Sequence, residues 1–291
     1  MNKLLIISGP TASGKTSLGF RLANKLNGEL VSADSRQIYR RMNIVTGKEI
    51  EKNIKTWLLD VVNPDEQFSV ADYYRLAWEA VEDIWKREKL PIIVGGTGFY
   101  IKTLLNGIGT VGIAPDWKLR RELEKLTVEE LGEQFQRADP KRWEQMNTSD
   151  RENPRRLIRA IEITVHLGGV HSATPEVVLR PRLTSGVNVF WIGLTAPFSV
   201  LYNRIDQRVD ERVKKGAVKE TKRLAEKYGW DIPSMTGQGY RELRGFIEGE
   251  TSFEEAVKRW KFAEHEYARR QMTWFKKEKR IVWFDISSNN F

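Results

Sequence analysis

Short apolar runs alternate with helix-period segments in the N-terminal third of the chain. Helices are predicted over Thr16–Leu26 and Val70–Arg87, because apolar residues there recur on one helical face. Three other runs have the length and composition of buried strands, namely Leu4–Ile7, Glu29–Ala33 and Leu90–Val94. Strands separated by helices are typical of a parallel sheet that helices cover on both faces.

The middle of the chain has a different pattern, with only charged helical segments between about Pro115 and Leu167. Asn153 followed by Pro154 is the expected cap and first position of the last of these helices. The pair Gly168-Gly169 is expected to end that helix. A helical insertion is therefore predicted between the third and fourth strands.

Two more β-type runs follow, Val187–Leu194 and Arg280–Ile286, and the region between them is again mostly helical. The predicted fold class is α/β, with a parallel sheet covered by helices and a mainly helical insertion domain. The predicted domains are a core made of residues 1–112 and 186–291 and an insertion made of residues 113–185.

A glycine-rich turn links the first predicted strand to the first predicted helix. Gly9–Thr16 reads GPTASGKT, which fits the pattern G-x-x-x-x-G-K-[ST]. In a strand–loop–helix context this pattern predicts a phosphate cradle (a P-loop) of the P-loop NTPase type, in which backbone N–H groups and the helix dipole attract an anion. Lys15 would reach the terminal phosphate and Thr16 would offer its hydroxyl to Mg²⁺. The alternative is a Gly/Ser turn that matches the pattern by chance.

Other candidate groups follow the neighbouring predicted strands. Asp34–Gln37 follows the second strand and Gly96–Gly98 follows the third, and ligands bind at the carboxyl ends of parallel strands. Asp34 is a candidate general base or Mg²⁺ partner, with a helix N-cap as the alternative. The third strand ends in glycine, where phosphoryl-transfer enzymes carry an Asp for Mg²⁺, and Leu58–Asp60 is a weak substitute. This favours a diphosphate that is held as a leaving group.

The composition excludes several classes of site. The chain of 291 residues has 40% hydrophobic residues and no cysteine, which excludes disulfides, zinc–thiolate sites and a cysteine nucleophile. Its three histidines, His166, His171 and His265, have no metal-ligand spacing. No segment approaches the roughly 18 apolar residues of a membrane span, and no signal peptide precedes the first strand. A soluble cytoplasmic protein with no membrane partner is expected.

The net charge of +9 indicates a polyanionic partner. Arg151–Arg159 holds four arginines and one acid, and Tyr267–Arg280 holds six basic residues and one acid with three aromatic residues interleaved. Basic residues mixed with aromatics suit phosphate contacts and base stacking. The alternative is a pair of solvated helix faces.

Several segments together resemble one family, the tRNA dimethylallyltransferases, also called tRNA isopentenyltransferases, of the bacterial type. They occur in the family's order and cover nearly the whole chain: GPTASGKT (Gly9–Thr16), SADSRQIYR (Ser32–Arg40), GGTGFY (Gly95–Tyr100), NPRRLIRAIE (Asn153–Glu162), RIDQRVDERVKKGAVKE (Arg204–Glu220), GQGYREL (Gly237–Leu243) and YARRQMTWFK (Tyr267–Lys276).

The resemblance implies a reaction and its partners. The dimethylallyl group of dimethylallyl diphosphate would move to the exocyclic amine of the adenosine on the 3′ side of the anticodon, in tRNAs that read codons beginning with U. That base would be flipped into a channel through the protein. The expected partners are tRNA, through its anticodon stem-loop, dimethylallyl diphosphate and Mg²⁺, and the expected state is a monomer.

The resemblance also implies site residues. The expected catalytic residues are Asp34 as the base, Lys15, Thr16 as the Mg²⁺ ligand, Thr97 beside the reacting amine, and Arg208 as a second cation on the diphosphate. The expected diphosphate loop is Gly9, Pro10, Thr11, Ala12, Ser13, Gly14, Lys15 and Thr16. The expected tRNA contacts are Asp34, Ser35, Arg36, Gln37, Thr97, Arg120 (at the channel mouth), Arg155, Arg156, Leu157, Ile158, Arg159, Thr236, Gly237, Gln238, Gly239, Tyr240, Arg241, Arg269, Arg270, Gln271, Trp274 and Lys276.

The sequence departs from the family pattern at Val45–Glu49, at Thr56-Trp57 and at Pro197–Ser199, and it ends at Phe291 with no zinc-finger extension. Two other functions stay open. A small-metabolite or nucleoside kinase would share the P-loop and the sheet, but it would consume ATP. A nucleotide-gated RNA-binding module would explain the charge, but it gives Asp34 no chemical role.

Overall fold

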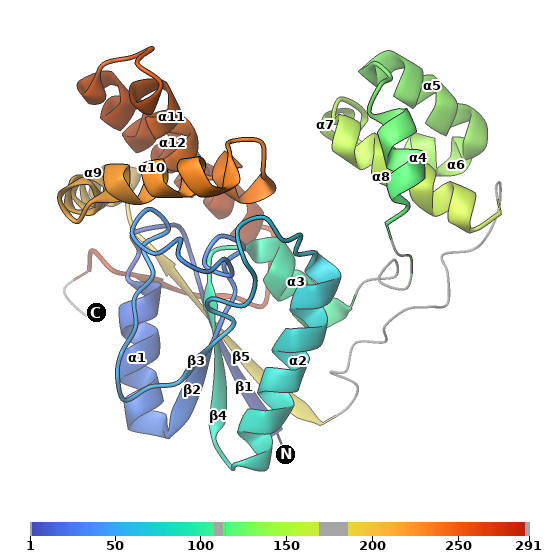
Figure 1. The fold of residues 1–291 in the computed structure, drawn as a ribbon. Helices are drawn as coiled ribbons and strands as arrows, with labels where there is room; N and C mark the ends of the chain where they lie inside the picture. Colours follow the sequence, from blue (N-terminus) through green and yellow to red (C-terminus); the bar gives the residue numbers. More distant parts are fainter. Residues whose placement is uncertain (1, 108–112, 114, 169–185, 289–291) are drawn as a thin grey trace. The chain divides into compact units, whose positions relative to one another are not determined.

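A computed structural model describes residues 2–107, 113, 115–168 and 186–288, which form two compact units (Figure 1). The first unit comprises Met1–Leu105 and Leu183–Phe291, and the second comprises Asn106–Arg182. Residues 112 and 185, at the predicted domain boundaries, lie outside the described residues, as do Gly169 and His171, so the boundaries stay a prediction. Within the described ranges, no helix is long and apolar enough to cross a membrane.

A parallel six-stranded sheet forms the centre of the first unit, in the order β3-β2-β4-β1-β5-β6. The strands are β1 (Asn2–Ser8), β2 (Gly28–Ser32), β3 (Thr56–Trp57), β4 (Leu90–Gly95), β5 (Val187–Thr195) and β6 (Val282–Asp285). The predicted α/β class and all five predicted strands are confirmed. The sixth, β3, was missed because two residues of mixed polarity carry no strand pattern.

The register of the central strands brings three loops to one edge of the sheet. Ser8 pairs with Gly95, and Ser32 pairs with Val94. The strands are parallel, so the P-loop after β1, Asp34 after β2 and Thr97 after β4 leave the sheet side by side.

The core of the first unit lies between this sheet and its helices. The helices are α1 (Lys15–Leu26), α2 (Val70–Lys86), α3 (Gly98–Asn106), α9 (Phe198–Lys214), α10 (Ala217–Tyr228), the short 3₁₀ helix η1 (Pro233–Thr236), α11 (Tyr240–Ile247) and α12 (Phe253–Phe275). Helices α1 and α2 run alongside the strands, and α9 to α12 lie beyond their carboxyl ends (Figure 1). Ile7, Ala23, Leu30 and Ile92 belong to one buried apolar cluster between α1 and the sheet.

The second unit is helical in its described residues, as the charged periodic pattern predicted. Its helices are α4 (Trp117–Leu123), α5 (Val128–Ala138), α6 (Pro140–Gln145), α7 (Thr148–Arg151) and α8 (Pro154–His166). The Asn153 side chain accepts a hydrogen bond from the Arg156 N–H, and Pro154 begins the helix. Gly168 follows its C-terminus with φ at +77°, a backbone angle that glycine adopts without strain.

The core of this unit corrects part of the predicted RNA surface. Leu157 and Ile158 are buried against Leu131 and Phe135, so their side chains hold α8 to α5 and cannot contact RNA. Two of the arginines predicted to contact tRNA, Arg120 and Arg159, also bind within the unit. Each forms an ion pair with Glu162, which is only 2% exposed.

Glu162 is the centre of a buried charge cluster. Arg120 donates to both of its carboxylate oxygens at 2.8 Å, Arg159 forms an ion pair with it, and the Asp116 N–H donates at 2.6 Å. Burial opposes ionisation, but the hydrogen bonds from both arginines hold the pKa of the Glu162 carboxyl below its usual value. Arg120 and Arg159 therefore have a stabilising role that their sequence motif did not reveal.

We expect Glu162→Ala to lower the free energy of unfolding of the second unit by about 3–5 kcal/mol, because two partly buried arginines would lose their counterion. Denaturant unfolding followed by circular dichroism measures this change. Glu133→Ala is the matched control, since Glu133 pairs with Arg137 on the exposed surface of α5. This substitution should lower the free energy of unfolding by less than about 1 kcal/mol. Equal losses in the two variants would contradict the role given to Glu162.

Candidate active site

The loop between β1 and α1 has the backbone geometry of an anion cradle. Gly9 and Gly14 have positive φ angles of 144° and 81°, and Ala12 between them has a φ of 62°. A Cβ on Gly9 would also overlap the carbonyl oxygen of Leu194 on β5. These positions turn the chain so that α1 begins at Lys15, at the carboxyl edge of the sheet.

A first cavity, the phosphate pocket, lies beside this loop and measures about 250 Å³. Its walls come from the loop, from the segment after β2 and from α9: Ala12, Gly14, Lys15, Thr16, Ser17, Glu49, Arg204, Gln207, Arg208 and Glu211. Arg208 lies here with Lys15 and Thr16, although nearly two hundred residues separate them in the chain. The structure thus brings the predicted second cation to the P-loop.

The cations of the phosphate pocket are partly desolvated. Burial, and then the neighbouring charge of Arg208, lower the pKa of Lys15 to about 7. Its ammonium group donates to the carbonyl oxygen of Pro10 at 2.6 Å. Burial, and then the charge of Arg212, lower the pKa of Arg208, which pairs with Glu49 at 3.2 Å. A bound polyanion would relieve this repulsion, so the pocket is electrostatically prepared for one.

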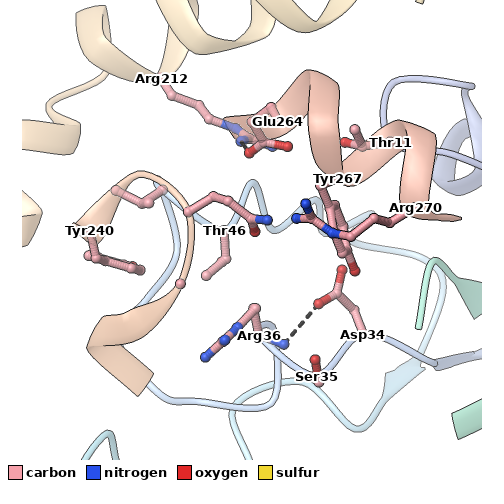
Figure 2. A pocket seen from close by; sticks show the side chains of 13 residues that line it. Thr11, Asp34, Ser35, Arg36, Thr46, Arg212, Tyr240, Glu264, Tyr267 and Arg270 are labelled. Atoms are coloured by element: carbon pink, nitrogen blue, oxygen red, sulfur yellow. Dashed lines mark hydrogen bonds and ion pairs between the residues drawn. The ribbon is translucent and has the colours of Figure 1, made fainter. Parts of the chain in front are cut away.

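A second cavity, the Asp34 pocket, adjoins the same loop and measures about 230 Å³ (Figure 2). Thr11 lines this pocket while Ala12, the next residue, lines the phosphate pocket. The other lining residues are Asp34, Ser35, Arg36, Val45, Thr46, Arg212, Gly237, Gln238, Tyr240, Glu264, Tyr267 and Arg270. Two consecutive residues of the P-loop therefore line two different pockets.

Asp34 is positioned by backbone contacts after β2. Its carboxylate accepts the Arg36 N–H at 2.8 Å, and the next four residues form turns, so the alternative of a helix N-cap is wrong. The Thr97 hydroxyl accepts the Ser35 N–H at 3.1 Å, and the Thr97 N–H donates to the Ala33 carbonyl at 3.1 Å. Thr97 is thereby held beside the Asp34 turn, as the order of the strands predicts.

Helix α12 supplies the facing wall, where Tyr267 and Arg270 point toward Asp34 (Figure 2). Burial, and then the charge of Asp34, raise the pKa of the Tyr267 hydroxyl, which also hydrogen bonds to Thr97. Tyr267 therefore stays a neutral phenol beside the carboxylate. Sequence reasoning named Tyr267 as an aromatic residue of the basic stretch but did not place it in the site.

A buried ion pair, which sequence reasoning missed, forms another wall of the Asp34 pocket. Arg212 of α9 donates to Glu264 of α12 at 3.0 Å, and both residues are nearly buried. Two signals in the sequence could have found these groups. Glu264, Tyr267, Gln271 and Trp274 share one face of α12, and Arg212 lies one turn after Arg208.

Gln271 joins helix α12 to two loops of the site. Its side-chain carbonyl accepts the Thr11 N–H at 2.7 Å, and its amide donates to the Gly96 carbonyl at 3.0 Å. A Cβ on Gly96 would overlap this amide, and one on Gly98 would overlap the indole of Trp274. Gln271 was predicted as a tRNA contact, but its side chain is 6% exposed and both of its polar ends bind the protein itself.

The remaining predicted residues fall into three groups. Gly237, Gln238 and Tyr240 line the Asp34 pocket, and Gly239, with a φ of 88°, lies against Trp260. Exposed residues are Thr236, Arg241, Arg269 and Lys276 in the first unit and Arg155 and Arg156 in the second, whereas Gln37 is half-buried.

Asp60 forms an ion pair with Lys48 at 2.7 Å, so it is not the missing carboxylate of a phosphoryl-transfer site.

The segment that departs from the family pattern lies at both pockets. Val45 and Thr46 line the Asp34 pocket, and Glu49 lines the phosphate pocket. The other departures are structural, since Thr56-Trp57 forms β3 and Pro197 precedes α9.

The oxygen atoms of the phosphate pocket suit a hard divalent cation. Thr16 offers a hydroxyl there, and Glu49 and Glu211 offer carboxylates. Mg²⁺ is commonly bound by few protein oxygens together with the phosphates of a substrate. In the described part of the chain, no cluster of three or more His, Asp or Glu side chains forms a metal site without a substrate.

The family model described as IPP transferase matches residues 37–278. The chain belongs to the IPP transferase family. A tRNA dimethylallyltransferase of Acetivibrio thermocellus is 40% identical over 98% of this chain and 92% of its own length. One from Roseiflexus castenholzii is 43% identical over 97% and 92%. These alignments, unlike the family model, extend over the P-loop region.

Solved structures of IPP transferases agree with this membership. The full-length tRNA isopentenylpyrophosphate transferase of Bacillus halodurans is 36% identical, with a TM-score of 0.71 over 98% of this chain and 90% of its own. A eukaryotic dimethylallyltransferase acting on tRNA is 26% identical, with a TM-score of 0.84 over 98% of this chain and 74% of its own. The fold is therefore that of the family over almost the whole chain.

We expect Gln271→Ala to disturb the site more than the fold, because the Thr11 N–H and the Gly96 carbonyl would lose their partner. The predicted result is a stability loss of about 1–3 kcal/mol and faster hydrogen exchange at Thr11. Hydrogen exchange with mass spectrometry measures the second effect. Thr273→Ala, a substitution at an exposed position two residues along α12, is the control. Unchanged hydrogen exchange at Thr11 in Gln271→Ala would contradict the role of Gln271 in holding the two loops.

Proposed function

We propose that this chain transfers the dimethylallyl group of dimethylallyl diphosphate to the exocyclic amine of an adenosine in tRNA. The adenosine is the one on the 3′ side of the anticodon, in tRNAs that read codons beginning with U. The products are N6-(dimethylallyl)adenosine and diphosphate. The observation that carries the proposal is the pair of pockets that consecutive P-loop residues line, one containing Lys15 and Arg208 and the other containing Asp34.

The phosphate pocket would hold the diphosphate of the donor. The backbone N–H groups of Gly14–Thr16, with the side chains of Lys15 and Arg208, would bind its oxygens and stabilise the charge that develops as the diphosphate leaves. Thr16 would hold Mg²⁺, with Glu49 and Glu211 near enough to bind its water shell. When bound, the metal neutralises charge on the leaving group.

The Asp34 pocket would hold the adenine, flipped out of the anticodon loop. The amine nitrogen would form a bond to the allylic carbon while the carbon–oxygen bond to the diphosphate breaks and its electron pair leaves with the oxygen. Asp34 would accept the proton that the amine loses. Thr97 and Tyr267, which hydrogen bond to each other beside Asp34, would orient the base.

Cations around the two pockets would contact the RNA. We propose this role for Arg36, Arg270 and the exposed residues Arg241, Arg269 and Lys276 near the Asp34 pocket. In the second unit, Arg155 is exposed and Arg156 is exposed but paired with Asp150, and both are better candidates than Arg120 and Arg159, which bind the buried Glu162. A tRNA substrate would place the enzyme in the cytoplasm, and we propose that it acts as a monomer.

A kinase on the same fold is not favoured. β4 ends in Gly95-Gly96, and Asp60 is bound to Lys48, so neither supplies the Mg²⁺-binding carboxylate that phosphoryl transfer uses. The relatives named above are transferases that modify tRNA, and their alignments cover this chain nearly completely.

We expect Asp34→Asn to lower the rate of prenyl transfer by about 10²- to 10⁴-fold, because the amide cannot accept the proton of the amine. The dissociation constant for tRNA should change by no more than about twofold, since the side chain keeps its size and its hydrogen bond to Arg36. Single-turnover transfer to unmodified tRNA and equilibrium binding measure the two effects.

The control for this prediction is Asp231→Asn, an exposed carboxylate that lines neither pocket. It should keep the wild-type transfer rate. Full activity in Asp34→Asn would remove Asp34 as the base.

A further inference from the structure

Helix α10 carries a basic surface for which the proposed reaction gives no role. Lys219, Lys222, Arg223 and Lys227 are exposed on this helix, and Glu226 is its one exposed acid within the described residues. Lys214 and Lys215, at the end of α9, extend the same surface. We call these six cations the α10 basic surface.

Among the described residues, no ion pair involves Lys214, Lys215, Lys219 or Lys222 of this surface. The arginines of the neighbouring helices differ, because Arg241, Arg244, Arg259 and Arg269 each pair with a glutamate. An unpaired cluster of like charges raises the energy of the free protein, and a bound polyanion would remove that cost.

The acid best placed to neutralise the surface is occupied elsewhere. Glu220 lies between Lys219 and Lys222 in the sequence, but its carboxylate is buried and accepts four hydrogen bonds. The donors are the N–H groups of Asn43, Ile44 and Val45, at 2.9, 2.9 and 3.0 Å, and the Tyr240 hydroxyl at 2.9 Å. Glu220 therefore binds α10 to the loop that lines the Asp34 pocket, and Glu226 is the exposed acid that remains among the four cations of α10.

A groove of about 360 Å³ lies on this surface. Four cations, Lys215, Lys219, Lys222 and Arg223, line it together with two acids, Glu220 and Glu226, and Ile44 contributes an apolar contact. Val45 and Thr46, which follow Ile44 directly, line the Asp34 pocket. A strand of RNA that delivers a base to that pocket would thus have its neighbouring phosphates within reach of the groove.

We infer that the α10 basic surface binds the phosphate backbone of the tRNA beside the flipped base. This inference rests on the proposed function for the identity of the RNA. It adds a contact surface on α9 and α10 to the tRNA contacts that the sequence resemblance implied, and it makes Glu220 the residue that fixes the distance between backbone and base.

The test is equilibrium binding of an unmodified tRNA transcript at several salt concentrations, for the full chain and a Lys219→Ala/Lys222→Ala variant. Two lost phosphate contacts should make the plot of log K against log salt shallower by about 1.4–1.8 and weaken binding roughly tenfold near physiological salt. A Lys25→Ala/Lys86→Ala variant is the matched control. It loses the same charge from the exposed C-terminal turns of α1 and α2, at the other end of the sheet.

The inference is supported if the slope changes in the α10 variant alone, with thermal midpoints alike in all three proteins. It is overturned if the α10 variant keeps the wild-type slope, if the control variant loses as much, or if the wild-type chain does not bind tRNA. Prenylation by the wild-type chain is measured separately. If no adenosine is modified while the α10 variant still changes the slope, the RNA surface stands and the proposed transfer fails.

Discussion

The contact between Gln271 and the two loops at the carboxyl edge of the sheet is the constraint on which the site depends. The P-loop and the loop after β4 leave neighbouring strands, but the strands alone do not fix how the loops face each other. One side-chain amide satisfies a donor in the first loop and an acceptor in the second. Because Gln271 lies on α12, the same contact also fixes the helix that carries Glu264, Tyr267 and Arg270.

The cations of the phosphate pocket are only partly compensated by neighbouring carboxylates. Lys15 and Arg208 repel each other at the phosphate pocket, and burial denies both of them full solvation. Asp34, Glu49 and Glu264 compensate only in part, since they raise the pKa of Lys15 less than burial and Arg208 lower it. A site for an anionic leaving group and a proton acceptor for the attacking amine are what a substitution at an allylic carbon requires.

Local patterns in the sequence predicted the parts of the site that are themselves local. Gly9–Thr16 and Asp34 could be found because each follows a buried strand, and parallel strands bring their carboxyl ends together. Tyr267, Glu264 and Arg212 were missed because their proximity to Asp34 depends on how α9 and α12 pack across the sheet edge, which no short segment encodes. Leu157 and Ile158 were assigned to the RNA surface because a family motif was read as a continuous surface, although one face of α8, which carries Leu157, Ile158 and Ile161, is buried in the core.

The central claim is that an allylic diphosphate held at the P-loop reacts with an adenosine beside Asp34. Incubating the protein with unmodified tRNA, Mg²⁺ and dimethylallyl diphosphate, followed by nuclease digestion and mass spectrometry of the nucleosides, tests it directly. The account predicts one prenylated adenosine per tRNA, on the 3′ side of the anticodon, and no product when dimethylallyl diphosphate is replaced by ATP. Absence of a prenylated adenosine from every tRNA that reads codons beginning with U would contradict it.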